Sequence, residues 1–124
     1  MESREMTDPL SLVALVERDV LGWPGVSKEF RRSPVGDATI YWLGKRHLGH
    51  IHIDGVADLQ FPKTVHDELI AAGRAEPHRG GFATVVSYAM RGPEDVPGAV
   101  ELFRLSYERV SAAVEARAQR RGAA

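Results

Sequence analysis

Three stretches of the chain place apolar residues three or four positions apart, the spacing of a helix with one buried face. The first follows Asp8 and Pro9, which suit an N-cap and a first helical position, and it stops before Gly22. The second opens at Pro62, and the third begins within residues 92–95. The stripe of the third helix comprises Val96, Val100, Phe103, Tyr107, Val110 and Val114. We therefore predict an N-terminal helix, a middle helix and a long C-terminal helix.

The segments between the first two helices are rich in β-branched and aromatic residues, which favour strands. The pattern predicts strands over 26–31, 38–43, 47–53 and 56–60, then a short extended piece at 75–78 and a strand within 82–90. Asp54-Gly55 is typical of a two-residue hairpin with positive φ at both residues. Such short connections cannot make parallel crossovers, so the strands should form an antiparallel meander. The predicted fold class is α+β, with the helices packed on one face of the sheet.

Length and composition support a single domain over residues 1–124. The chain has 124 residues, 44% hydrophobic and 27% charged, which is ordinary for a globular protein. A chain of this size can bury one core without disulfides. The polar residues 1–7 and the tail 120–124 should be loose, which leaves an ordered core of about 8–118.

Charge and cysteine content narrow the possible partners and compartments. Sixteen basic and 17 acidic residues give a net charge of −1, which disfavours nucleic acid as a partner without excluding a local basic patch. There is no cysteine, which fits a reducing compartment. We expect a cytoplasmic protein without a membrane partner, because no apolar run is long enough to span a bilayer and the first residues do not resemble a signal peptide. The sequence indicates no oligomeric state.

The segment 47–54 carries the most unusual side chains. In a strand, alternate residues share a face, so His50, His52 and Asp54 should project together while Ile51 and Ile53 face the core. Two imidazoles at this spacing can chelate a metal ion or act as acid and base.

Three interpretations of this pair stay open. The histidines are ordinary half-exposed strand residues, or they form a shared polar site for a ligand or acid–base work, or they bind a metal ion. The third interpretation needs a further ligand, for which Asp58, His66 and His78 are candidates. His66 itself is expected to be exposed or to cap its helix, and His47 should share the face of Ile51 and has no assigned role.

The candidate site residues follow from this segment and its neighbours. The candidate catalytic residues are His50, His52 and His78, and the candidate ligand-binding residues are Asp54, Asp58, Trp42 and Tyr88. No metal ligand is assigned. The chain lacks a P-loop, a Gly-x-Ser-x-Gly elbow and a dinucleotide-binding fingerprint, so we predict no cofactor.

Several motifs, in order along the chain, resemble the small bacterial and fungal proteins of the luciferase-domain family. They are the segments 49–55 (GHIHIDG), 59–62 (LQFP), 67–69 (DEL), 71–78 (AAGRAEPH) and 105–107 (LSY), within a likeness that covers about 15–110. Where that family often has a second histidine, this chain has Arg79 followed by a shortened Gly80-Gly81 connection. The resemblance implies neither light emission nor any assigned catalytic residue. A more distant likeness to MmcQ/YjbR-like proteins implies a frataxin-like α+β fold and a rival function in DNA binding.

Two functions are therefore expected. The first is binding of a small molecule, either as a binding protein or as an accessory or tailoring enzyme, with the strand histidines as acid, base or ligand anchors. The alternative is a non-enzymatic module that binds DNA or protein through a basic rim. That rim would contain Arg31, Arg32, Lys45 and Arg46.

Overall fold

The computed structural model describes residues 8–123, so the segment 1–7 and Ala124, which we expect to be loose, lie outside the described part. The elements in chain order are α2 (Pro9–Val20), β1 (Val26–Arg31), β2 (Ala38–Leu43), β3 (Arg46–His52), β4 (Val56–Gln60), α3 (Lys63–Ala71), β5 (Glu76–Pro77), β6 (Val85–Ala89), the short 3₁₀ helix η1 (Pro93–Asp95) and α4 (Val96–Ala123). The predicted order of helices and strands is confirmed.

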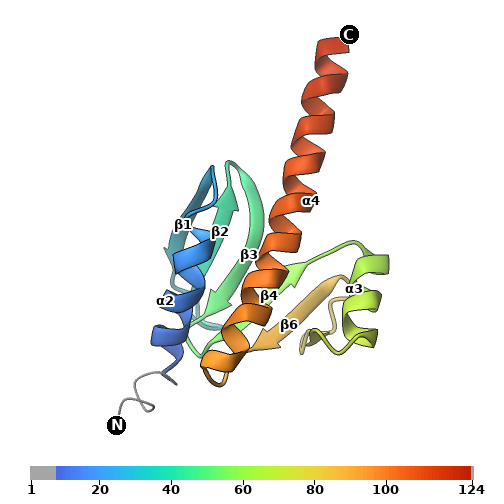
Figure 1. Ribbon diagram of the computed structural model, residues 1–124. Helices are drawn as coiled ribbons and strands as arrows, with labels where there is room; N and C mark the ends of the chain where they lie inside the picture. The colour runs from blue at the N-terminus through green and yellow to red at the C-terminus, as the bar shows by residue number, and fades with distance from the viewer. Residues whose placement is uncertain (1–7, 124) are drawn as a thin grey trace.

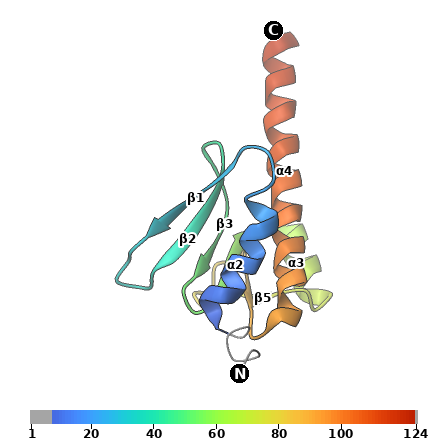
Figure 2. The ribbon, with the colours of Figure 1, turned by 60° about the vertical axis from the view of Figure 1, so that its left-hand side comes forward.

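The six strands form one antiparallel sheet in the order β1-β2-β3-β4-β6-β5. The first four strands make the predicted meander, since each pairs with its neighbour in the chain (Figures 1 and 2). After α3 the chain returns, and β6 pairs with β4 while the two-residue β5 forms the edge. The α+β fold class is thus confirmed.

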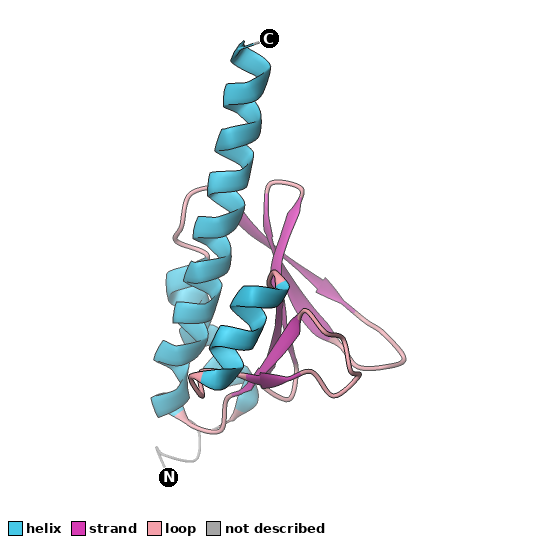
Figure 3. Ribbon diagram, turned by 90° about the vertical axis from the view of Figure 1, so that its right-hand side faces the viewer, coloured by secondary structure: helices cyan, strands magenta, loops and turns pink. Residues whose placement is uncertain are grey.

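All three helices lie on one face of the sheet, and none of the described residues forms a helix over the other face (Figure 3). α2 and α4 pack against each other, α4 also packs along β3 and β4, and α3 lies beside β5 and β6. Helices of this kind must bury their apolar stripe, and a single sheet face gives all three the same place to do so. The uncovered face of the sheet is consequently available for polar side chains.

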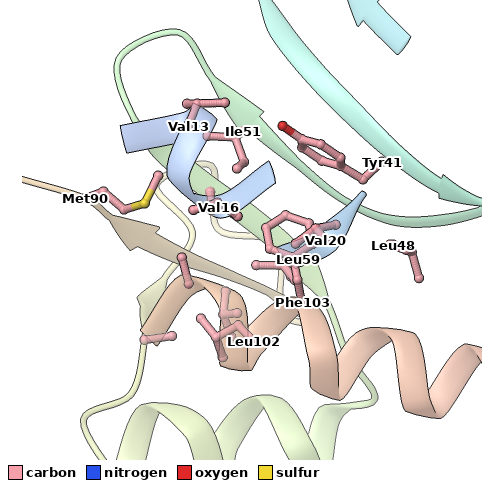
Figure 4. Close-up of a cluster of buried hydrophobic side chains, with 14 of the residues drawn as sticks. Val13, Val16, Val20, Tyr41, Leu48, Ile51, Leu59, Met90, Leu102 and Phe103 are labelled. Atoms are coloured by element: carbon pink, nitrogen blue, oxygen red, sulfur yellow. The ribbon is translucent and has the colours of Figure 1, made fainter. Parts of the chain in front are cut away.

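The core fills the layer between the helices and the sheet (Figure 4). α2 contributes the predicted face of Leu12, Val13, Val16 and Val20. α2 is also tied to the sheet by a polar contact, because the buried Tyr41 hydroxyl donates a 2.6 Å hydrogen bond to Oε2 of Glu17.

The C-terminal helix differs from its prediction in register and length. Its buried residues are Ala99, Leu102, Phe103 and Ser106, while Val114 is exposed. The predicted stripe fails at Val114 because α4 continues beyond the sheet (Figure 1), so its later turns are mostly exposed. The helix reaches Ala123, beyond the expected end near 118. No helix within residues 8–123 has the length and apolar character that crossing a bilayer requires.

The hairpin between β3 and β4 also differs from its prediction. The register His50↔Asp58 and Ile51↔Ala57 leaves a three-residue connection, 53–55, in which only Gly55 has a positive φ, of 88°. The Gly55 N–H donates to the His52 carbonyl at 2.9 Å, which closes the turn. The expectation that Ile53 faces the core is therefore wrong: it lies in the turn and is 49% exposed.

Candidate functional site

The site lies on the uncovered face of the sheet, where three strands present polar side chains in one row. His50 on β3 is paired across the ladder with Asp58 on β4, and Asp58 is paired with Ser87 on β6. Directly opposed residues in a sheet share a face and place their Cβ atoms roughly 5 Å apart. Strand pairing therefore brings together residues that are 8 and 29 positions apart in the sequence. His52 joins them because it lies two residues after His50.

Asp58 is the centre of this cluster. It is only 3% exposed, yet one of its oxygens, Oδ2, lies within 3.5 Å of three imidazoles. The Oδ2 atom is 2.9 Å from Nε2 of His52, 3.4 Å from Nε2 of His50 and 3.5 Å from Nε2 of His78. The other oxygen, Oδ1, accepts a 2.6 Å hydrogen bond from the Ser87 hydroxyl. The structure thus brings together the predicted residues His50, His52, Asp58 and His78.

Asp58 is held as a carboxylate. Burial alone would raise its pKa, but hydrogen bonding from His50, Ser87 and His52 outweighs burial and holds the pKa of Asp58 well below its usual range. A buried carboxylate of this kind fixes the orientation of the imidazoles around it and stabilises a positive charge on them.

His78 reaches the cluster from the loop that follows β5. The Gly80 N–H donates to its Nδ1 at 2.9 Å, so in this geometry Nδ1 is the acceptor nitrogen and Nε2 carries the proton. The protonated Nε2 then lies 3.5 Å from Oδ2 of Asp58. The ring also lies 5.2 Å from the ring of Phe82, measured between centroids. The turn at Gly80 therefore determines which nitrogen of His78 faces the site.

His47 also belongs to the cluster, contrary to its predicted place beside Ile51. The β2–β3 register shifts between Tyr41 and Trp42: Tyr41 is paired with Gly49, and Trp42 with His47. The extra residue, Leu48, forms a β-bulge that reverses the alternation of side chains before it. His47 consequently lies on the uncovered face with His50 and His52, here called the histidine face. Its Nε2 lies 3.4 Å from Nδ1 of His50. Partial burial, with the nearby His50 and Arg31, lowers the pKa of His47.

The bulge has a tertiary partner on the helix side. The buried Ser106 hydroxyl of α4 donates a 2.7 Å hydrogen bond to the carbonyl oxygen of Leu48. This bond satisfies a carbonyl at the point where the register shifts. The helix layer thereby supports the irregularity that brings His47 to the opposite face.

The remaining predicted ligand-binding residues lie in different places. Trp42 is on the histidine face, where its ring lies 5.6 Å from that of His47 and its indole N–H donates to Glu29. Asp54 lies in the β3–β4 turn, where its carboxylate accepts the Val56 N–H, and it lines a cavity beside the cluster.

Two other predicted residues are not part of the cluster. Tyr88 follows Ser87 on β6 and therefore faces the helices, where its hydroxyl donates to the Asp95 carbonyl at 2.7 Å. His66 is buried on α3, 7% exposed, and no side chain caps the N-terminus of this helix, so the expectation that His66 is exposed or caps its helix is wrong. Its Nδ1 lies 2.8 Å from a carboxylate oxygen of Asp67, and its Nε2 has no hydrogen-bond partner in the structure.

Cavities lie on both sides of His52. One of about 370 Å³ is lined by His52, Asp54, Asp58, His78, Arg79 and Ser87 together with Val35 and Ile53. The other, of about 320 Å³, is lined by Arg31, Ala38, Ile40, Trp42, His47, His50 and His52. Cavities that hold small organic ligands begin at about this size. Apolar side chains are exposed nearby, with Val35 92% and Ile53 49% exposed at the rim.

Two residues of the site carry no signal that could have identified them in the sequence. Ser87 becomes relevant only through its pairing with Asp58, and Glu29 only through its bond to Trp42. Both depend on strand registers rather than on local motifs.

One family model describes a large part of this chain. The model of the luciferase domain matches residues 45–106, half of the chain, and this span includes all four histidines around the cluster and Asp58. Comparison with curated proteins and with solved structures gives no significant match. The likeness to MmcQ/YjbR-like proteins therefore stays a prediction, whereas the chain belongs to the luciferase-domain family.

Proposed function

We propose that this protein binds a small organic molecule on the uncovered face of its sheet and uses the strand histidines as acid, base or anchoring groups. The observation that carries the proposal is the buried Asp58 carboxylate, with the Nε2 atoms of His50, His52 and His78 all within 3.5 Å of one of its oxygens. Asp58 and the three histidines converge beside two cavities. A sheet face that is merely solvated does not need such a convergence of polar side chains.

His52 is best suited to act as the base. When its Nε2–H group donates to Asp58, its Nδ1 is the basic nitrogen. This atom lies 3.7 Å from the position that a Cβ of Gly36 would occupy, and Gly36 lines both cavities. A carboxylate on the far side of the ring stabilises the imidazolium that forms when Nδ1 takes a proton.

The surroundings indicate the class of ligand. Val35 and Ile53 supply apolar surface at the rim, and Arg79 adds a cation beside the histidines. A molecule with an apolar body and an acidic hydroxyl or carboxylate matches this combination. Binding of that kind removes exposed apolar surface from water and pairs the anion with imidazole or guanidinium donors.

Salicylate is a suitable probe because it combines an aromatic ring with a carboxylate and a hydroxyl. Titration followed by NMR of the imidazole groups should shift the signals of His50, His52 and His78 and leave those of His66 unchanged. Asp58→Asn should weaken salicylate binding about tenfold or more, since hydrogen bonds to charged groups contribute about 1.5–3 kcal/mol.

Asp67→Asn is the matched control, because the Asp67 carboxylate also pairs with a histidine, His66, but lies on α3, outside the cluster. Circular dichroism and thermal unfolding check that both variants are folded. If folded Asp58→Asn and wild type bind salicylate equally, or if the imidazole signals do not move, the proposal is wrong.

A second candidate, binding of a polyanion such as nucleic acid, is favoured by one observation. A cavity of about 310 Å³ between the β2–β3 turn and the outer part of α4 is lined by Lys45, Arg46, Arg117 and Arg121. Phosphate contacts of this type weaken steeply as salt rises. We expect salt-sensitive retention of the protein on DNA that is lost when Arg117 and Arg121 are both changed to Glu.

The control for charge is the pair Lys63→Glu and Arg74→Glu, which changes the net charge equally but lies away from that cavity. Equal retention of both double variants, or no retention of wild type at low salt, would exclude this second function.

A further inference from the structure

We infer that the cluster is a binding site for one divalent first-row transition-metal ion, with His50, His52 and Asp58 as ligands. Each of these residues offers one donor atom, and the three donor atoms lie within 4.8 Å of one another. The inference rests on the proposed function only for the role of the ion, which is to anchor the organic ligand. With the ion on Nε2, His52 keeps its proton on Nδ1 and anchors the ligand through the metal instead of acting as the base. Metal binding itself can be tested separately.

The two separations between Asp58 and its histidine donors fit a single ion. Metal–ligand bonds of about 2.1 Å at angles of about 90–110° place neighbouring donor atoms about 3.0–3.4 Å apart. The observed separations from Oδ2 of Asp58 are 2.9 Å to Nε2 of His52 and 3.4 Å to Nε2 of His50. The first of these is a short hydrogen bond, and the second is a longer contact to the same oxygen.

Groups around two of the three ligands, Asp58 and His50, hold them as metal sites usually require. Ligating carboxylates commonly accept a second hydrogen bond, and ligating imidazoles commonly use their other nitrogen in one. Asp58 Oδ1 accepts the Ser87 hydroxyl at 2.6 Å, which leaves Oδ2 for the ion. Nδ1 of His50 lies 3.4 Å from Nε2 of His47. If His50 donates from Nδ1, its Nε2 presents a lone pair toward Asp58.

His78 takes a different part. Its Nδ1 accepts the Gly80 N–H, so its Nε2 carries a proton and cannot ligate. We assign it as a positioning residue whose Nε2–H donates to Asp58 or to an oxygen atom bound at the ion. Three protein ligands then leave open coordination positions toward the cavities that flank His52.

The donor set selects the class of ion. Two imidazoles and one carboxylate suit Zn²⁺, Fe²⁺, Co²⁺ or Ni²⁺, whereas Mg²⁺ and Ca²⁺ prefer oxygen ligands throughout. Two histidines and one carboxylate with open positions are also the ligand set of mononuclear non-haem iron(II) sites. An oxygen atom of an acidic organic ligand could occupy an open position.

The test is a calorimetric titration of the full chain, first freed of metal with a chelator, with Zn²⁺ and separately with Mg²⁺. We expect one Zn²⁺ per chain and no measurable binding of Mg²⁺. His52→Ala and Asp58→Asn should each lower the Zn²⁺ affinity about 100-fold, and His78→Gln about tenfold, as expected for loss of an outer hydrogen bond. His66→Gln, a buried histidine outside the cluster, is the matched control and should bind as wild type does.

A measurement on the wild-type chain does not depend on whether the variants fold. In ¹⁵N NMR, Zn²⁺ should move the proton of His52 from Nε2 to Nδ1, shift the Nε2 signal of His50, and not change His66. Absence of Zn²⁺ binding, equal affinity in the folded ligand variants, or an unchanged tautomer of His52 would each overturn the metal site. If the metal site is overturned but salicylate still shifts the imidazole signals, the proposed function stands without the metal. If Zn²⁺ binds and salicylate does not, the metal site stands and the proposed ligand class is wrong.

Discussion

Gly49 lies on the covered face of β3, directly behind the histidine cluster, and no larger residue fits there. A Cβ at this position would lie 2.9 Å from both Cγ of Leu59 and Cε1 of Phe103, closer than packed carbon atoms approach. Both neighbours are fully buried and cannot move freely. We expect Gly49→Ala to lower the free energy of unfolding by about 1–3 kcal/mol through overpacking, as measured by urea denaturation.

Gly122→Ala is the control for the loss of a glycine. A Cβ at Gly122 would meet no atom within 4 Å, and the residue lies in α4, so alanine should be neutral or stabilising by at most about 1 kcal/mol. If Gly49→Ala and Gly122→Ala unfold at the same urea concentration, the close packing behind the cluster is not important for stability.

The sequence identified most of the cluster but not its geometry. The alternation of β3 placed His50 and His52 together, and the structure confirms this. The carboxylate between them is Asp58 and not Asp54. This follows from the register of the β3–β4 hairpin, because the turn has three residues and not the predicted two. Tyr88 was assigned to the same site, but the pairing of Ser87 with Asp58 turns it to the opposite face.

At the scale of elements, the sequence predicted the bounds of β1, β2 and β4 to the residue. β-Branched and aromatic residues together with turn signals determine such ends locally. The local signal for the bulge at Leu48 is weak: Gly49 follows it directly, and a glycine inside a strand is compatible with a bulge but does not show which residue is the extra one. It depends on the register with β2 and on the hydrogen bond from Ser106 in α4, a contact across 58 residues. His47 was therefore placed on the wrong face.

The strands β5 and β6 illustrate a second limit. A sequence shows that they are extended but not which strand they join, and β6 joins β4 across the intervening helix α3. This long-range pairing provides Ser87 and brings the loop with His78 toward Asp58. The partners of the histidine pair therefore depend on strand register, which local sequence patterns do not determine.

At the scale of the whole molecule, helices on one face of the sheet and polar chemistry on the other separate stability from function. The core lies between α2, α4 and the sheet (Figure 4), and the helices cover only one face of that sheet (Figure 3). The cluster lies on the uncovered face. Asp58 is the exception, because it is buried within the sheet and yet belongs to the site. Substitutions at His50, His52 or His78, which are each about one quarter exposed, should therefore affect binding more than folding.

The outer part of α4 provides a test of this separation, because it extends beyond the sheet (Figure 1). Val114 is 43% exposed, and the residues beyond it are polar or small, so they bury little apolar surface. Removal of residues 115–124 should change the free energy of unfolding by no more than about 0.5 kcal/mol and leave the Zn²⁺ affinity as in the full chain. Loss of Arg117 and Arg121 also relieves repulsion with Lys45 and Arg46, which share a cavity with them.

Phe103→Ala, by contrast, removes a fully buried ring and should lower the free energy of unfolding by about 3–5 kcal/mol. Urea denaturation and calorimetry measure both quantities, and a truncated chain that unfolds as readily as Phe103→Ala would show that the outer helix is needed for the fold.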